Sequence, residues 1–198
     1  MLKKEIEKNF KKESSEFNSI LNIFLSQNNK NFNELCLKSI RAIKNKKKII
    51  FFGNGGSASD SQHLATELTV RFNKNRKALP GLALTTDTSA LTAIGNDFGF
   101  KYIYSRQIEA LGQPGDICIA ITTSGNSQNL IEALKIANRK GLITFCFSGN
   151  NGGKIKKFTK FPILIPSKNT ALIQVLEIFI GQIYCKIIED YFYMKNKK

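Results

Sequence analysis

The sequence predicts an α/β fold in which helices cover both faces of a parallel sheet. Five short runs of apolar and β-branched residues lie along the chain, at residues 49–52, 81–85, 117–122, 143–147 and 161–166. Each run is followed by a polar or glycine-rich loop and a stretch with helical spacing. Strands that are apolar on both faces and separated by helices are typical of a parallel sheet with right-handed crossovers.

Helices are expected at both ends of the chain. The first spans about residues 3–26, the second about residues 32–46, and the last about residues 170–193. The first helix carries its apolar residues at helical spacing, namely Ile6, Phe10, Phe17, Ile20, Leu21, Phe24 and Leu25. One small sheet cannot cover so wide a stripe, and we therefore expect this helix to take part in oligomerisation.

Length and composition predict one soluble domain. The 198 residues are 42% hydrophobic and 23% charged, as in a globular protein with a single core. We expect one domain over residues 1–198, with N-terminal helices in residues 1–47 and an αβα core in residues 48–193. No apolar run approaches the roughly 20 residues that cross a bilayer, and the N-terminus is charged. A cytoplasmic location without a membrane partner is therefore expected.

The charge balance and the cysteines point to ordinary surface and core roles. Thirty Lys and Arg against fifteen Asp and Glu give a net charge of +15. The lysines crowd the first fifty residues with few arginines and no interleaved aromatics, so we expect a solvated surface and no nucleic-acid partner. Buried free thiols are predicted at the four separated cysteines, Cys36, Cys118, Cys146 and Cys185.

Two loops after predicted strands have the composition of anion-binding sites. Residues 53–59 (GNGGSAS) follow the first strand and open a helix, and residues 122–127 (TTSGNS) bring several hydroxyls to another helix N-terminus. Either loop alone is also typical of an N-capped turn. Because the carboxyl ends of parallel strands meet at one edge of a sheet, the two loops together predict a bound phosphate monoester there.

Two further features of this edge have alternative explanations. Residues 85–88, running on to residues 95–99, offer polar groups to sugar hydroxyls, but caps and turns explain them equally well. The helix opened by the first loop carries His63, the only histidine, and Glu67 one turn later. A lone helical histidine is more often structural. Its position just past an anion-binding loop favours a metal-ligand pair, or a carboxylate base with an orienting partner.

Four segments resemble the phosphoheptose isomerases of the sugar isomerase (SIS) superfamily. They are GNGGSASDSQHLATEL, ALTTDTSALTAIGNDFGF, the TSGNS loop and TALIQ, in order and with matching spacing from about Phe51 to Glu189. The resemblance implies a flavodoxin-like three-layer αβα sandwich with a five-stranded parallel sheet, and a homotetramer with shared active sites. It also implies bound zinc and the conversion of sedoheptulose 7-phosphate to D-glycero-D-manno-heptose 7-phosphate through an enediol, toward the heptose of bacterial lipopolysaccharide.

The resemblance also implies a role for each matching residue. Glu67 is the implied catalytic carboxylate. The implied zinc ligands are His63, Glu67, Gln174 and Gln182. The implied substrate-binding residues are Asn54, Gly55, Gly56, Ser57, Glu67, Asn96, Asp97, Thr122, Thr123, Ser124, Ser127 and Gln174.

The chain departs from the family on its last helix. Gln182 stands where the family usually has a histidine that binds zinc and acts as the second acid/base, and Glu177 stands at another position that is normally histidine. An amide oxygen binds zinc more weakly than imidazole, so we expect zinc to be held loosely or not at all. Glu177 lies about 140° around the helix axis from Gln182 and is not a simple replacement. Glu67 alone could then remove and return the proton, with loss of part of the roughly 10²–10⁴-fold that a second acid/base supplies.

Two other functions remain as alternatives. The first is a non-catalytic SIS scaffold resembling the protein that binds the bacterial replication initiator, which also lacks the final histidine. The missing histidine and the basic surface favour this scaffold, whereas the retained His63, Glu67 and Gln174 favour an enzyme. The second is a phosphosugar sensor, which has less support because the sequence shows no appended DNA-binding region.

Overall fold

A computed structural model describes residues 1–27 and 30–195 of the chain. Its five parallel strands form one sheet in the order β2-β1-β3-β4-β5. They are β1 (Ile49–Gly53), β2 (Gly81–Ala83), β3 (Ile117–Thr122), β4 (Ile143–Gly149) and β5 (Phe161–Ile165). This strand order is that of flavodoxin-like proteins, and the predicted α/β class and five-stranded parallel sheet are confirmed.

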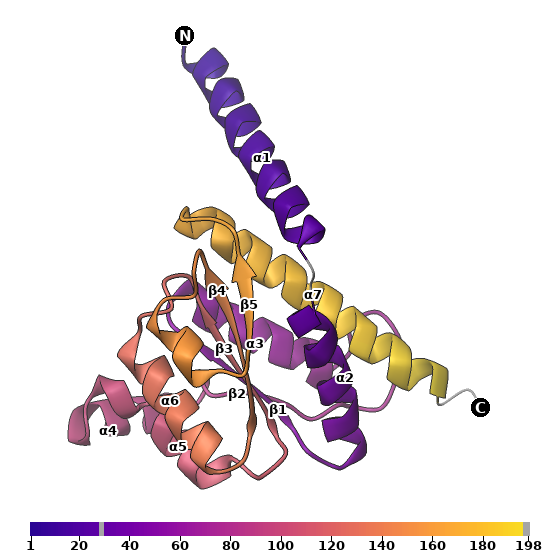
Figure 1. The fold of residues 1–198 in the computed structure, drawn as a ribbon, viewed down its shortest axis with the longest axis vertical. Coiled ribbons are helices and arrows are strands. Elements are labelled where there is room, and N and C mark those ends of the chain that lie inside the picture. Colours follow the sequence, from indigo (N-terminus) through magenta and orange to yellow (C-terminus); the bar gives the residue numbers. More distant parts are fainter. Residues whose placement is uncertain (28–29, 196–198) are drawn as a thin grey trace.

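Helices cover both faces of the sheet, as the strand pattern predicted (Figure 1). One face carries α2 (Lys30–Lys44), α3 (Gly56–Thr69) and α7 (Thr170–Lys195), whose apolar side chains share a core with Phe51 of β1 and Ile119 of β3. The other face carries α4 (Thr88–Asp97), η1 (Phe100–Tyr102), α5 (Ser105–Leu111), α6 (Gln128–Arg139) and η2 (Lys154–Phe158). Phe51 lies beside Ala83 of β2 and Ile119 of β3 in the sheet register.

The second strand is shorter than the sequence predicted, because β2 ends at Ala83 and not at residue 85. β2 lies at an edge of the sheet and pairs only with β1. The Leu84 N–H still donates to the Phe51 carbonyl, after which the chain turns away toward α4. The second helix also begins and ends two residues earlier than expected.

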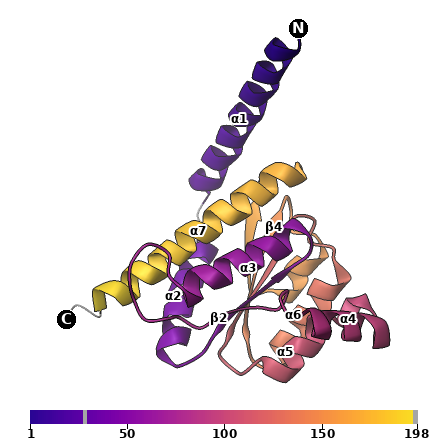
Figure 2. The ribbon, with the colours of Figure 1, turned by 180° about the vertical axis from the view of Figure 1, so that it is seen from behind.

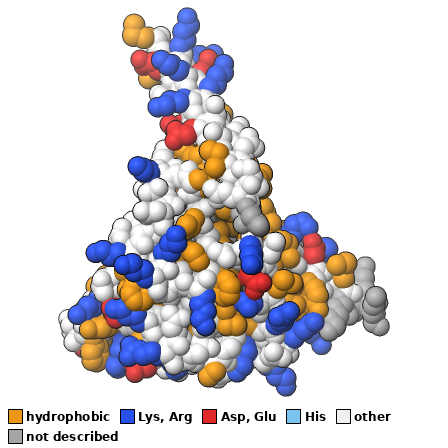
Figure 3. Space-filling view, in the orientation of Figure 1, with side chains coloured by type: hydrophobic (Ala, Val, Ile, Leu, Met, Phe, Trp, Pro, Cys, Tyr) orange, Lys and Arg blue, Asp and Glu red, His pale blue; other side chains and the backbone are white. Residues whose placement is uncertain are grey.

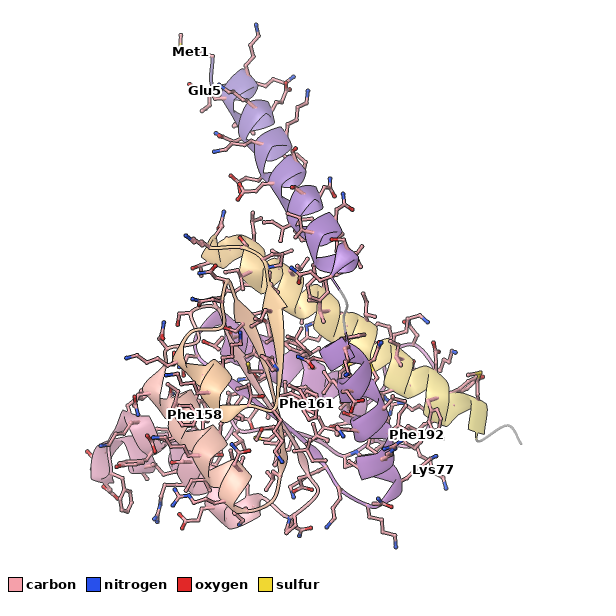
Figure 4. All side chains as sticks on the ribbon, in the orientation of Figure 1. Met1, Glu5, Lys77, Phe158, Phe161 and Phe192 are labelled. Atoms are coloured by element: carbon pink, nitrogen blue, oxygen red, sulfur yellow. The ribbon has the colours of Figure 1, made fainter. Side chains whose placement is uncertain are left out.

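The first helix, α1 (Leu2–Ser26), projects from the body of the molecule (Figures 1 and 2). Its C-terminal part packs on the core through Ile20 and Phe24. Met1 and Glu5 lie at its free end, far from the sheet (Figure 4). Ile6 and Phe10 are exposed, and hydrophobic side chains also appear where α1 meets the body (Figure 3). A single chain therefore leaves much of the predicted stripe uncovered.

The last helix corrects one expectation from the sequence. By length and composition alone, α7 could cross a membrane over Thr170–Met194, whereas no apolar run of that kind was expected. In the sequence, polar residues interrupt this helix, so no long unbroken apolar run is visible. Half of its most apolar window is buried inside the protein, where Leu176, Ile180 and Tyr184 belong to the core. Packing on the sheet explains why this helix is so apolar. All four cysteines are buried and unpaired, as predicted.

Candidate active site

The two predicted anion-binding loops meet at the carboxyl ends of β1 and β3, where the strand order reverses. Asn54 of the first loop and Asn129 of α6 form a reciprocal amide pair, with Nδ2 to Oδ1 distances of 2.9 and 2.8 Å. Asn129 is buried, and its pair with Asn54 ties the two loops together. Sequence reasoning missed Asn129. Its only signal was a second amide in the first turn of the helix that follows the hydroxyl-rich loop.

Glycines shape the first loop. Gly55 precedes α3 with φ +55, a left-handed conformation that glycine adopts without strain. A Cβ on Gly56 would lie 2.5 Å from Nε2 of Gln174 on α7, so a larger residue there would displace that amide from the loop. The structure thus brings together Gly56 and Gln174, two residues that were predicted to bind substrate, and that role stays a prediction.

The second loop is a tight turn with hydroxyls on both sides. The Thr122 hydroxyl accepts from the Gly125 N–H at 3.2 Å, and the Ser124 hydroxyl accepts from the Asn126 N–H at 3.2 Å. Thr123 is half-buried, and Ser127 is the N-cap residue of α6. The positive end of the α6 dipole therefore faces this turn. Backbone N–H groups, hydroxyls and a helix N-terminus together suit a phosphate group.

His63, Glu67 and Gln182 form a compact cluster between α3 and α7, which we call the polar triangle. Nε2 of His63 lies 3.0 Å from Oε1 of Glu67, and Nε2 of Gln182 lies 2.9 Å from the His63 nitrogen and 3.5 Å from the Glu67 oxygen. The Glu67 side chain is 19% exposed and that of His63 is 52% exposed, so the cluster opens to solvent. Three of the four predicted zinc ligands are thus brought together, and Gln174 lies against Gly56 instead.

The polar triangle has the dimensions of a zinc site. Ligands of tetrahedral zinc, each about 2.0–2.1 Å from the metal, lie about 3.3 Å apart. A 180° rotation of the Gln182 amide exchanges its nitrogen and oxygen, so that the oxygen can face the ion. Within residues 1–27 and 30–195, no cluster of three or more His, Cys, Asp or Glu side chains could hold a metal. Any zinc here therefore depends on an amide as its third ligand.

Glu177 lies in a different place, beneath the first turn of α3. Its side chain is buried, and its Oε2 is 3.5 Å from the Ser57 hydroxyl. Burial raises the pKa of Glu177 well above its ordinary value and nearby Asp60 raises it further, while hydrogen bonds from Ser57 and the Thr122 backbone lower it less. Glu177 therefore does not take the place of the missing histidine beside Glu67. It lies buried beneath the first loop, next to Ser57.

The raised pKa of Glu177 predicts how stability depends on pH. The native state keeps this proton to higher pH than the unfolded chain, whose pKa is near 4.5. Glu177 therefore lowers the free energy of unfolding as pH rises above 4.5, by up to about 1.4 kcal/mol per pH unit until the folded-state pKa is reached. We expect Glu177→Gln to match the wild type near pH 4 and to be more stable at pH 8. Urea unfolding at both pH values measures this, and an equal stability difference at both would contradict it.

Asn96 and Asp97 are not brought to the polar triangle within one chain. They end α4, where the Asn96 amide donates to the Asp97 carboxylate at 2.8 Å, and both are exposed. Because α4 packs on the opposite face of the sheet from α3 and α7, the sheet separates the two groups (Figure 1). These two residues were predicted to bind substrate, and that role stays a prediction.

The fold and the site define a class of proteins, the SIS domain. Residues 14–149 match the family model described as "SIS domain". Two curated relatives are the phosphoheptose isomerases of Aquifex aeolicus, 51% identical over 75% of this chain and 78% of that protein, and of Campylobacter concisus, 44% identical over 97% of both. A solved phosphoheptose isomerase from Neisseria gonorrhoeae superposes with a TM-score of 0.88 at 36% identity, over 93% of this chain and 99% of that one. The chain belongs to the phosphoheptose isomerase family of SIS-domain proteins.

Proposed function

We propose that this protein is an aldose–ketose isomerase that converts sedoheptulose 7-phosphate to D-glycero-D-manno-heptose 7-phosphate. The observation that carries the proposal is the polar triangle, which places the Glu67 carboxylate between α3 and α7, on the helix that begins at the first anion-binding loop. Relatives at 44–55% identity are named phosphoheptose isomerases, which supports this substrate. The protein would act in the cytoplasm, and its product would be used to make the heptose of bacterial surface polysaccharides.

The two loops would hold the phosphate and orient the sugar chain. The hydroxyls of Thr122, Thr123, Ser124 and Ser127 and the N-terminus of α6 are suited to the phosphate. From there the sugar would extend past Asn54, which Asn129 fixes in position, toward Glu67. Such positioning brings the reacting carbons to the base and removes the entropic cost of a chance encounter.

Glu67 would act as the base. Its carboxylate takes a proton from C1 of the ketose, giving an enediol, and returns it to C2, while the hydroxyl proton moves from O1 to O2, so that C2 gains a hydroxyl and C1 becomes the aldehyde. The substrate gains and loses no atoms overall in these two proton transfers. The amide of Gln182 can donate a hydrogen bond to the oxygen atoms of the enediol but cannot titrate. We therefore propose that Glu67 is the proton-transferring group of this site.

Zinc would be held by His63, Glu67 and Gln182. When bound, zinc would supply Lewis-acid polarisation of the substrate carbonyl. Since one ligand is an amide, we propose weak occupancy.

A homotetramer is the assembly that we propose, with active sites shared between subunits. Support comes from the exposed apolar residues of α1 and from a second exposed stripe on α7, formed by Val175, Phe179, Ile183 and Ile187. The separation of Asn96 and Asp97 from the polar triangle is in keeping with these residues serving the site of a neighbouring subunit.

Light scattering at micromolar concentration should therefore give four times the 22.2 kDa of one chain. Phe10→Lys, on the uncovered part of α1, should shift the protein toward smaller species, because it places a charge on the apolar stripe. The control is Lys11→Ala, beside it on the same helix and outside that stripe. A monomeric wild type would contradict the proposal.

A direct assay tests the proposed activity. Purified protein is incubated with sedoheptulose 7-phosphate, with added zinc or with chelator, and the aldose product is followed. Thermal unfolding gives an independent test of binding, because a ligand that binds only the native state raises the melting temperature. Binding without turnover under all metal conditions would favour the non-catalytic SIS scaffold, and the absence of both would exclude a phosphosugar site.

A further inference from the structure

A buried ion pair joins the loop after α3 to the last helix. Nε of Arg76 lies 3.2 Å from Oε1 of Glu189, and both side chains are 1% exposed. The loop that carries Arg76 runs back along the C-terminal half of α7 (Figure 2). Taking two charges out of water is costly, so a pair as buried as this one needs further partners on both sides.

The further partners of Arg76 are the last carbonyls of α3. Nη2 donates to the Glu67 carbonyl at 2.7 Å, and Nη1 donates to the Leu68 carbonyl at 2.8 Å. Carbonyls in the last turn of a helix lack partners within the helix, and a cation there also complements the helix dipole. One of the two carbonyls belongs to Glu67 itself. The guanidinium thus holds the backbone of the residue whose carboxylate is the proposed base.

The further partners of Glu189 are three consecutive backbone N–H groups of the loop. Phe72, Asn73 and Lys74 donate to its two oxygens at 2.8, 2.7 and 2.9 Å. Burial raises the pKa of Glu189, but these N–H groups and Arg76 together outweigh burial, so the pKa lies below its ordinary value. Glu189 is therefore a carboxylate at neutral pH, and it fixes the loop that presents Arg76.

The ion pair and the polar triangle lie on one line along α7. Glu189 follows Gln182 by seven residues, or about two helical turns, so both point to the same side of the helix. Toward the C-terminal end of α3, two polar contacts join it to α7: Gln182 contacts His63 and Glu67, and Glu189 holds Arg76 against the last carbonyls of α3. The second of these contacts restrains the end of α3 that carries Glu67.

We propose that Arg76 and Glu189 are positioning residues for the isomerase reaction, which set the place of the Glu67 carboxylate relative to Gln182 and the substrate. This inference rests on the proposed function. Stability alone does not explain the pair, because apolar residues of similar size are often equally stabilising in such positions. The Arg76 guanidinium donates hydrogen bonds to the Glu67 and Leu68 carbonyls and so fixes the end of the helix that carries the base. Apolar residues cannot form these hydrogen bonds.

The test compares Arg76→Met with Asp190→Asn. Asp190 forms exposed ion pairs with Lys74 of the same loop and Lys186 of α7, so its loss is the matched control. Kinetics with sedoheptulose 7-phosphate and the ring-proton NMR signals of His63, the only imidazole of an untagged chain, are measured without metal. We expect Arg76→Met to lower kcat by about 10²-fold with little change in KM, as a misplacement of about 1 Å does. It should also shift the His63 signals, whereas Asp190→Asn should change neither.

Two further variants separate positioning from folding. In Arg76→Met/Glu189→Met both charges are removed, so no unpaired buried charge remains, and stability should recover relative to Arg76→Met while kcat stays low. If Arg76→Met does not fold, Glu189→Gln, which keeps the shape and an acceptor oxygen, takes its place. Wild-type kcat in the double variant, or unmoved His63 signals in a folded single variant, would overturn the inference. If the wild type is inactive both without metal and with added zinc, the proposed function fails, and the His63 signals alone decide the positioning role.

Discussion

Glu67→Gln should abolish the isomerase activity of this protein. The amide keeps the size and shape of the side chain and can retain the contact with His63, but it cannot accept the proton from the substrate carbon. Loss of a general base costs about 10²–10⁴-fold, and the other titratable side chain of the polar triangle, His63, is a proposed zinc ligand and not a proposed base. Initial rates with sedoheptulose 7-phosphate measure the effect, and we expect kcat to fall with KM nearly unchanged.

The matched control is Glu34→Gln, which removes a carboxylate paired with Lys38 on α2, on the surface of the same chain. It should leave kcat unchanged. Melting temperatures of both variants should stay close to that of the wild type, because the Glu67 side chain is partly exposed and the substitution is isosteric. Unchanged turnover in Glu67→Gln would show that another residue is the base.

The fold could be predicted from the sequence because its signals are local. The strands β1 and β3 are buried along their whole length, and such strands appear in a sequence as unbroken apolar runs. The edge strand β2 was predicted two residues too long, because the apolar run at residues 81–85 does not show where pairing with β1 stops. Only the three-dimensional packing of α7 shows that its apolar length serves the core.

The candidate site was predicted in part, for a similar reason. His63 and Glu67 are one turn apart on one helix, so their contact follows from helical spacing alone. The contact of Gln182 with both is between helices, and it was suggested only by the family resemblance. Arg76 stands in a polar stretch that is typical of an exposed loop. Its burial depends on Glu189, 113 residues later in an apolar helix, and a pair so distant leaves no local signal.

Gln182→His should give the polar triangle a stronger zinc site. Nε2 of His63 and Oε1 of Glu67 already lie 3.0 Å apart, and imidazole is a better zinc ligand than an amide. We expect zinc affinity to rise by at least about tenfold, since even changes outside the ligand shell alter it by roughly 10–100-fold. Competition with a chromophoric chelator measures this without any assay of turnover. The new imidazole also titrates near neutral pH and can act as a second acid/base, so kcat should rise as well.

The control for this variant is Gln128→His on α6. Gln128 lies one turn before Glu132 and contacts it at 2.8 Å, so the substitution creates another histidine and glutamate pair on a helix surface, away from Gln182. The new histidine and Glu132 together offer zinc two ligands and not three, so zinc affinity should stay at the wild-type value. Equal gains in both variants would mean that zinc binds any such surface pair. No gain in Gln182→His would mean that α3 and α7 do not present the three side chains to one ion, and would count against zinc at this site.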